Sequence, residues 1–264
     1  MTETLRVKVS GPVATITLDR AEVHNAFDAQ LAANLTQAFQ KLGVADAVRV
    51  VVVEAAGPSF SAGLDIGWMR HSAAQEAGEN LRDAMQAAMM LDAVDRCPKP
   101  VVAMVHGAAL GAGAGLVAAA DIAIAATEAS FALSEVRLGL ASSLIAPYLE
   151  TAIGARACRR YMMTGERFDS REALRLGLVH GVVAADRLAA ARDHVVEACL
   201  KGGPKAQAAT KELIRVVEDS PRGPDLMRFA ASHFSDQRAS DEGREGLAAV
   251  ADKRNPAWIG PPTD

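Results

Sequence analysis

A glycine-rich stretch and a glutamate further along the chain are the residues best suited to chemistry. The stretch His106–Gly115 alternates glycine with small apolar residues and follows the apolar, strand-like run Val101–Val105. A loop of this kind at the start of a helix presents free backbone N–H groups, which suit a developing oxyanion. Glu135 lies twenty residues beyond Gly115 and could transfer protons. The alternative is that the glycines serve only a tight turn between strand and helix.

The same stretch can be aligned with a dinucleotide-binding fingerprint, but its surroundings do not fit one. Residues Gly113–Ala118 match G-x-G-x-x-A after a strand. Only five residues separate Gly115 from Asp121, however, whereas a parallel crossover needs about a dozen or more. No Lys-Ser or Lys-Thr pair follows the glycines, so the stretch is not a P-loop either.

A second loop of small residues, Phe60–Asp65, also follows a predicted strand. Taken alone, it is equally consistent with an ordinary turn between a strand and a helix. Two such loops together could supply two backbone donors from different strands, which is the minimum for an oxyanion hole.

Three further side chains have a structural interpretation beside a functional one. Glu135 has apolar neighbours, which suit acid–base work, but Arg137 two residues on is also consistent with a solvated surface turn. Ser142 could line a pocket, although capping the following helix is its more common role. Lys253 is typical of a helix C-terminus and could also meet phosphate groups.

Composition and motifs exclude several classes of function. The net charge of −4 argues against a nucleic-acid partner. The six histidines are scattered, without a G-x-S-x-G or H-E-x-x-H motif, and the three cysteines lack metal or redox spacing. No signal pattern is present, and no apolar run approaches the roughly 20 residues of a membrane span. We expect a cytoplasmic protein with no metal, no cofactor and no membrane partner.

Alternating strands and helices predict an α/β core whose apolar strands are covered on both faces. The predicted strands are Leu5–Val9, Val13–Asp19, Val48–Glu54, Val101–Val105, Ile122–Ala125 and Leu178–Val183. The predicted helices are Phe27–Leu42, Glu79–Arg96, Leu144–Ile153, Ala155–Met163, Ser170–Leu176 and one that ends near Leu200.

The character of the chain changes after Gly202-Gly203-Pro204, where the predicted strands stop. A segment of about sixty residues is too small for a good core of its own. We therefore expect a core over residues 1–200 and a helical segment over residues 201–264 that packs on the core or on another subunit. The helices predicted in this segment are Lys205–Val217, Asp225–Phe234 and Glu242–Lys253.

These features together resemble the enoyl-CoA hydratase/isomerase, or crotonase, family. The resemblance covers nearly the whole chain, and the order and spacing of its pieces are more specific than any one motif. The matching pieces are Asp19-Arg20, Asn25-Ala26, Phe60–Asp65, Val105–Gly113, Asp121–Ala125, Phe131–Gly139, Gly177–Val179, Ser240–Gly246 and Lys253-Arg254.

The resemblance implies an α/β fold built as a spiral of ββα repeats, with C-terminal helices that form a homotrimer or a dimer of trimers. It implies an acyl-CoA substrate, so that coenzyme A is part of the substrate and not a cofactor. The thioester oxygen would meet the backbone N–H groups of Leu64 and Ala112, with Glu135 as the general acid/base. Further substrate contacts implied by position are Arg20, Asn25, Ala62, Asp65, Ile66, Gly111, Gly115, Ser142 and, from a neighbouring subunit, Lys253.

The chain departs from the family pattern at Gly115. Hydratases of the family commonly carry two glutamates, of which the second corresponds to Glu135 and the first to Gly115. The chain is similar to bacterial 3-methylglutaconyl-CoA and isohexenylglutaconyl-CoA hydratases of leucine and acyclic-terpene breakdown, which also lack the first glutamate. The similarity lies in three stretches, Leu133–Leu140, Ile145–Tyr148 and Arg159–Asp169. The substrates of these hydratases carry a second carboxylate, for which Arg70 and Arg137 are the candidate partners.

The resemblance therefore predicts reversible addition of water to a 2-enoyl-CoA, with Glu135 as the single acid/base. A Δ3,Δ2-enoyl-CoA isomerase is the first alternative, because one base that shuttles one proton needs no second glutamate. A decarboxylase or a thioesterase of the same fold stays open. A non-catalytic, RNA-binding protein on this scaffold is a further alternative, which the acidic charge disfavours.

Overall fold

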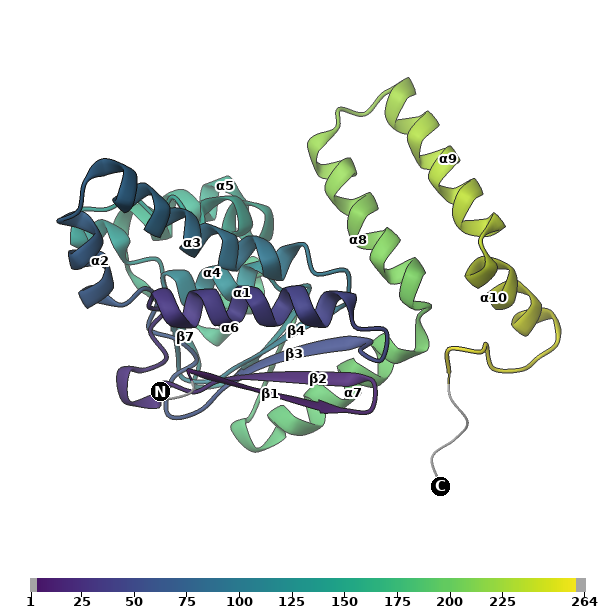
Figure 1. The fold of residues 1–264 in the computed structure, drawn as a ribbon, viewed down its shortest axis with the longest axis horizontal. Coiled ribbons are helices and arrows are strands. Elements are labelled where there is room, and N and C mark those ends of the chain that lie inside the picture. Colours follow the sequence, from purple (N-terminus) through teal and green to yellow (C-terminus); the bar gives the residue numbers. More distant parts are fainter. Residues whose placement is uncertain (1–3, 260–264) are drawn as a thin grey trace.

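A six-stranded sheet lies at the centre of the molecule (Figure 1). The computed structural model describes residues 4–259. The first two strands form the predicted hairpin, with Gly11 (φ 54°) and Pro12 as its turn, and the remaining pairs are parallel. In spatial order the strands are β1 (Leu5–Ser10), β2 (Val13–Leu18), β3 (Val50–Ala55), β4 (Val101–Val105), β6 (Ile122–Ala126) and β9 (Gly181–Val183).

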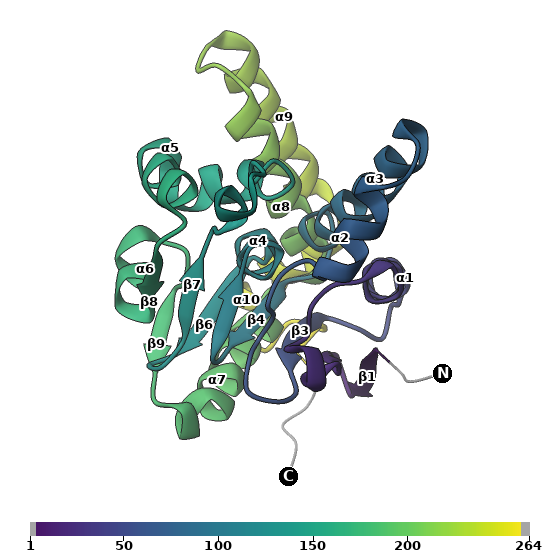
Figure 2. The same cartoon turned by 90° about the vertical axis from the view of Figure 1, so that its left-hand side faces the viewer.

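Helices cover both faces of this sheet, as the continuous apolar strands predicted (Figure 2). Val51 and Val53 of β3 join a large core with α1, α3, α4 and α5, whereas Val52 packs with Val196 of α7 on the opposite face. The helices of the core are α1 (Ala29–Val44), α2 (Ile66–Ala73), α3 (Ala77–Asp95), α4 (Ala112–Ala119), α5 (Ala146–Thr164), α6 (Ser170–Leu176) and α7 (Leu188–Lys201).

A second, three-stranded sheet was missed by the sequence analysis. Each of its strands has three residues, too few for an alternating pattern to be read. The rings of Phe131 and Phe168, on neighbouring strands, stack with their centroids 5.6 Å apart. The strands, in spatial order, are β5 (Ala108–Leu110), β7 (Ser130–Ala132) and β8 (Arg167–Asp169).

Glycines and an aspartate explain where the helices differ from the prediction. The two helices predicted on either side of Gly154 form the single element α5, with a kink at Gly154 (φ 76°, ψ 154°). The helix α2 was not predicted; Asp65 caps it by accepting from the Trp68 N–H at 3.0 Å. The last strand begins at Gly181, not Leu178: Gly177 ends α6 in a left-handed conformation (φ 92°), and the N–H groups of Leu178 and Val179 still donate to Ala173 O of that helix.

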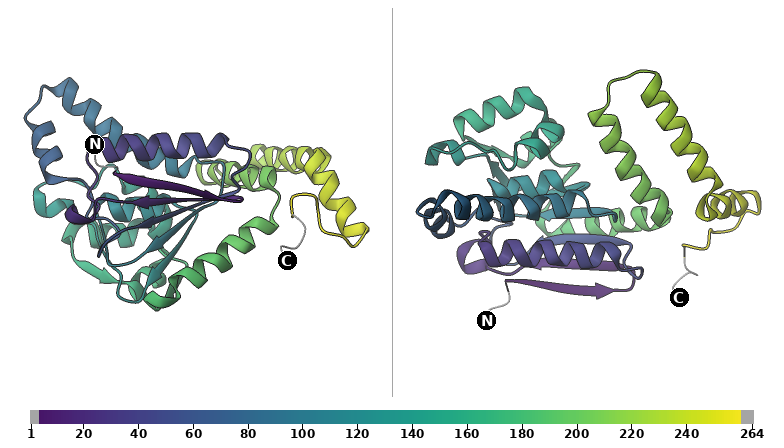
Figure 3. Two further views of the ribbon diagram at one scale, coloured as in Figure 1. Left: turned by 60° about the horizontal axis from the view of Figure 1, so that its bottom comes forward. Right: turned by 45° about the horizontal axis from the view of Figure 1, so that its top comes forward.

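The predicted C-terminal helices extend away from the sheet (Figure 3). No residue of the first two is buried in the single chain. Lys211 anchors the segment through an ion pair with Asp121 at 2.8 Å, and the Arg49 guanidinium donates to the carbonyls of Gly202 and Trp258. Within residues 4–259, no helix is both long and apolar enough to cross a membrane. The three helices are α8 (Pro204–Asp219), α9 (Pro224–Ala239) and α10 (Asp241–Ala251).

Candidate active site

The two small-residue loops lie side by side and are joined by backbone hydrogen bonds. The Ser61 N–H donates to Ala108 O and the Leu110 N–H donates to Ser61 O, each at 2.9 Å. Gly63 (φ 91°) allows close approach, since a Cβ there would lie 2.7 Å from Leu110 O and 3.4 Å from Ala112 N. The fold therefore brings the end of the Phe60–Asp65 loop against the start of α4.

Two backbone N–H groups at this junction are available to a ligand. Neither the Leu64 N–H nor the Ala112 N–H donates a hydrogen bond to another group within residues 4–259. Ala112 is the first residue of α4, where N–H groups have no partner inside the helix and the helix dipole is positive. Gly111 turns the chain into the helix with φ 49° and ψ −119°, a conformation that only glycine adopts readily.

Glu135 lies against this glycine turn. The Gly111 N–H donates to Ala132 O at 2.8 Å and so ties the turn to β7, three residues before the glutamate. A Cβ on Gly111 would lie 2.6 Å from Glu135 Oε1, which means that the carboxylate packs directly on the glycine backbone. The other oxygen, Oε2, accepts from the buried Ser142 hydroxyl at 2.8 Å. The Ser142 side chain forms no capping hydrogen bond at the start of α5, and its predicted contact with a ligand stays a prediction.

Gly115 is buried and has no room for a side chain. A Cβ at this position would lie 2.4 Å from Ile145 Cγ2 and 3.6 Å from Leu91 Cδ1. The space that a glutamate would need is thus filled by apolar atoms. The site consequently contains one carboxylate, Glu135, where a two-glutamate site would contain two.

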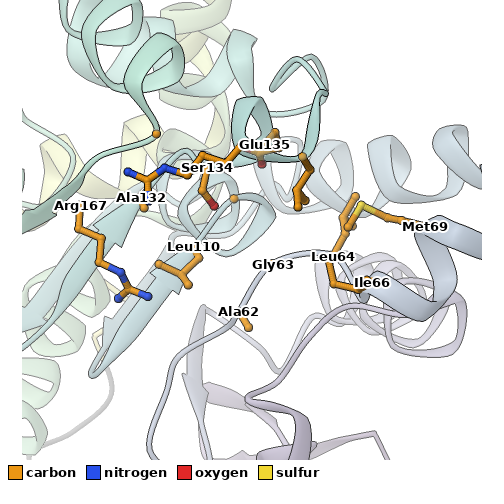
Figure 4. Close-up of a pocket in the computed structure, with 14 residues that line it drawn as sticks. Ala62, Gly63, Leu64, Ile66, Met69, Leu110, Ala132, Ser134, Glu135 and Arg167 are labelled. Atoms are coloured by element: carbon orange, nitrogen blue, oxygen red, sulfur yellow. The ribbon is translucent and has the colours of Figure 1, made fainter.

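A cavity of about 350 Å³ opens between these elements (Figure 4). Its volume falls within the range of small-molecule sites. Glu135, Leu64, Ala62, Ile66 and Gly111, all predicted from the sequence, lie on its wall. The complete lining is Ala62, Gly63, Leu64, Ile66, Met69, Leu110, Gly111, Ala132, Ser134, Glu135, Arg137, Leu138, Gly165 and Arg167.

Other predicted contact residues lie outside this wall. The Asn25 side chain is fully buried, and its amide donates to the carbonyls of Ala56 and Ser59 at 2.8 Å each. Arg20 pairs with Asp28 at 3.1 Å.

Asp65 and Lys253 were also predicted to contact the substrate, and neither is among the residues that line the cavity. Asp65 caps α2. Lys253 is exposed, with φ 54°, just after α10. The predicted site residues Ala112, Gly115 and Ser142 are not among the lining residues either. Contact of all these residues with a ligand stays a prediction.

Several lining residues were not singled out from the sequence. Met69 comes from the unpredicted helix α2, Gly165 ends α5 as its C-cap residue, and Arg167 begins the unpredicted strand β8. Ser134 and Leu138 flank Glu135, and only their closeness to that residue could have marked them. Arg137 was a candidate, and it lies on the wall, whereas the other candidate, Arg70, does not.

Comparison with known proteins gives a consistent result over nearly the full length. The sequence profile of the family described as enoyl-CoA hydratase/isomerase matches residues 8–261. The chain belongs to the enoyl-CoA hydratase/isomerase family. The carnitinyl-CoA dehydratase of Citrobacter koseri is 32% identical over 264 residues, covering 98% of this chain and all of that protein.

Solved structures of family members show the same fold. An enoyl-CoA hydratase from Shewanella pealeana has a TM-score of 0.94 at 39% identity, over 97% of this chain and 96% of that one. AtuE from Pseudomonas aeruginosa has a TM-score of 0.93 at 36% identity, over 98% of this chain and all of that one. The predicted crotonase fold is thereby confirmed, and an acyl-CoA substrate is consistent with the family.

Proposed function

We propose that this chain adds water reversibly to a 2-enoyl-CoA thioester, with Glu135 as its single acid/base. The observation that supports it most directly is the packing of Glu135 on Gly111, beside the free N–H of Ala112 and across the loop junction from that of Leu64. Glu135 would then be the proton-transfer group, and the Leu64 and Ala112 N–H groups would be the donors to the thioester oxygen. Similarity to a hydratase and a dehydratase, which add or remove water, supports the same reaction.

In the proposed reaction the two N–H groups of Leu64 and Ala112 bind the thioester oxygen. When a nucleophile attacks C3, the electrons of the double bond move toward this oxygen and an enolate develops. Preorganised donors stabilise that charge, and each is typically worth about 3 kcal/mol of the barrier. The donors thus lower the barrier without themselves transferring a proton.

Glu135 then handles the protons in both halves of the reaction. Its carboxylate takes a proton from water as the water oxygen bonds to C3, and the resulting carboxylic acid returns a proton to C2 as the enolate collapses. The net change is addition of H and OH across the double bond. Ser142 would hold Oε2 through its hydroxyl, which leaves Oε1 against Gly111 as the oxygen that transfers the proton.

A Δ3,Δ2-enoyl-CoA isomerase is the second candidate, and the apolar surroundings of Gly115 favour it. Isomerisation moves one proton between C4 and C2 and needs no water, so a single carboxylate is enough. If the reaction is hydration, we further propose that the substrate is a branched glutaconyl-CoA, whose acyl group would lie in this cavity.

Product analysis in water labelled with ¹⁸O separates the two reactions. The purified chain would be incubated with a 2-enoyl-CoA and, separately, with the corresponding 3-enoyl-CoA. The hydratase proposal predicts a 3-hydroxyacyl-CoA that carries ¹⁸O from the 2-enoyl substrate. Conversion between the two enoyl esters without incorporation of ¹⁸O would contradict hydration and favour the isomerase.

We also propose that the C-terminal segment mediates self-association. Large apolar side chains of α8–α10 are exposed in the single chain, and such surface is usually covered by a partner. Size-exclusion chromatography with light scattering should give a trimer or a hexamer, whereas a monomer would contradict the proposal. The exposed apolar residues are Ile214, Val217, Met227, Phe229, Phe234, Leu247 and Val250.

A further inference from the structure

Two arginines line the candidate cavity without a carboxylate partner. Arg137 belongs to the short 3-10 helix that begins at Glu135, and Arg167 begins β8. Within residues 4–259 the Arg137 guanidinium forms neither a hydrogen bond nor an ion pair. In the same part of the chain, Arg167 donates only to the Ser130 hydroxyl, at 3.3 Å. Two positive charges on one cavity wall are thus left for a ligand to neutralise.

The carboxylates near these arginines are already engaged elsewhere. Glu166, beside Arg167 in sequence, pairs with Arg160 at 2.7 Å. Asp169, which lies on the same side of β8 as Arg167, accepts from the Glu172 N–H at 2.8 Å and so caps α6. Neither forms an ion pair with Arg137 or Arg167 within residues 4–259, although Arg137 contributes, after Arg160, to the lowered pKa of Glu166. An external carboxylate would therefore displace no existing ion pair.

The fold holds each arginine in a defined place. The Arg137 side chain lies across Gly165, where a Cβ would be 3.0 Å from its Nε. Arg167 pairs with Ala132 across the β7–β8 ladder. Phe168 then points to the opposite side of the strand, into the core, where it stacks on Phe131. A positioned guanidinium is well suited to bind a carboxylate through paired N–H groups.

Arg167 lies across the cavity from Leu64 and Met69 (Figure 4). An acyl group whose thioester oxygen meets the Leu64 N–H would therefore extend past Glu135 toward the arginines. We propose that Arg137 and Arg167 form an anion subsite for the far end of the acyl group. This subsite selects acyl-CoA esters that carry a carboxylate beyond the reacting double bond. The inference rests on the proposed function only in placing the acyl group in this cavity.

Binding of two unreactive ligands tests the subsite apart from catalysis. Glutaryl-CoA ends in a carboxylate, and in 5-methylhexanoyl-CoA two methyl groups replace the carboxylate oxygens. Calorimetry should show tighter binding of glutaryl-CoA by the wild-type chain. Because charged hydrogen bonds contribute more than neutral ones, we expect Arg137→Gln and Arg167→Gln each to reduce that preference about tenfold. The double variant should abolish it.

Arg70→Gln is the matched control, because Arg70 is exposed on α2 and does not line the cavity. It should leave unchanged the preference for glutaryl-CoA, measured as the dissociation constant of 5-methylhexanoyl-CoA divided by that of glutaryl-CoA. Added salt should lower this ratio in the wild type. The effect of salt on the CoA phosphates cancels in the ratio, because both ligands carry them. The salt series uses only the wild-type chain, so it tests the subsite even if a variant does not fold.

Equal losses for both ligands in the cavity variants would overturn the proposal, as would a wild-type chain with no preference for glutaryl-CoA. Hydration is measured separately. A chain that prefers glutaryl-CoA through both arginines but hydrates no enoyl-CoA would refute the proposed function and leave the anion subsite standing.

Discussion

Gly115→Ala tests the claim that apolar packing excludes a side chain at the position of the missing acid. The new Cβ would lie 2.4 Å from Ile145 Cγ2 and 2.9 Å from its Cβ, far inside contact distance. Overpacking a buried site typically costs about 1–3 kcal/mol. Replacing glycine by alanine inside a helix contributes about 1 kcal/mol in the opposite direction. Steric repulsion should win, and the free energy of unfolding should fall by up to about 2 kcal/mol.

Thermal and urea unfolding at one fixed protomer concentration would measure this change, since self-association also affects stability. For a chain of this size, the largest expected loss corresponds to a melting temperature lower by roughly 4–8 °C. Gly78→Ala is the matched control. Gly78 lies in the first turn of α3, and nothing but the end of Arg82 comes within 4 Å of an added Cβ there. That variant should be neutral or stabilised by up to about 1 kcal/mol.

A double-variant cycle with Ile145→Ala identifies the contact responsible. Removing Cγ2 should relieve most of the repulsion, so that adding Gly115→Ala to this background costs little or stabilises the chain. Stabilisation by Gly115→Ala in the wild-type background, comparable to that of Gly78→Ala, would refute the reasoning. The same contact predicts that Gly115→Glu fails to create a working second acid.

Three further substitutions follow from the contacts of the described residues. Gly111→Ala forces a Cβ to within 2.6 Å of Glu135 Oε1, so kcat should fall at least about 100-fold, whereas acyl-CoA turnover near the wild-type level would contradict the packing. Ser142→Ala removes a charged hydrogen bond of about 1.5–3 kcal/mol from Oε2, so steady-state kinetics should show kcat reduced about 10- to 100-fold, with recovery in Ser142→Thr. Hydrogen bonding to Arg254 lowers the pKa of Glu245 from 4.5 to about 2. The stabilisation by Glu245 is therefore complete above pH 4.5 and lost as the pH falls toward 2, and Glu245→Gln should make unfolding less dependent on pH in that window.

The sequence was sufficient for the large elements of the fold and insufficient for the small ones. Continuous apolar runs such as Val101–Val105 can be recognised because they are long enough to contrast with their flanks. The strand Arg167–Asp169 has three residues, alternates charged and apolar, and depends on pairing with Ser130–Ala132 far along the chain. Its absence from the prediction is also why Arg167 was missed as a cavity residue.

The site was predictable where backbone geometry follows from small residues in sequence. The sequence analysis correctly paired the loops around Gly63 and Gly111. Glycine-rich turns after strands indicate that two backbone segments pass close to each other. The partner of Glu135 was not predictable, because Ser142 reaches it through a turn whose path no local pattern encodes. Likewise, the sequence shows that glycine stands at position 115, where hydratases of the family commonly carry their first glutamate. Only the three-dimensional structure identifies Ile145 as the residue that fills the space.

The most direct test of single-carboxylate hydration is the steady-state rate of Glu135→Gln on a 2-enoyl-CoA. Glutamine keeps the size of the side chain and can still accept from Ser142, but it cannot take up a proton from water. Proton transfer by a positioned group is typically worth about 10²–10⁴-fold, so kcat should fall by that factor. The dissociation constant for a saturated acyl-CoA should stay within about threefold of wild type, because the oxyanion donors are backbone groups. A variant that retained most of its hydration rate would contradict the central role of Glu135.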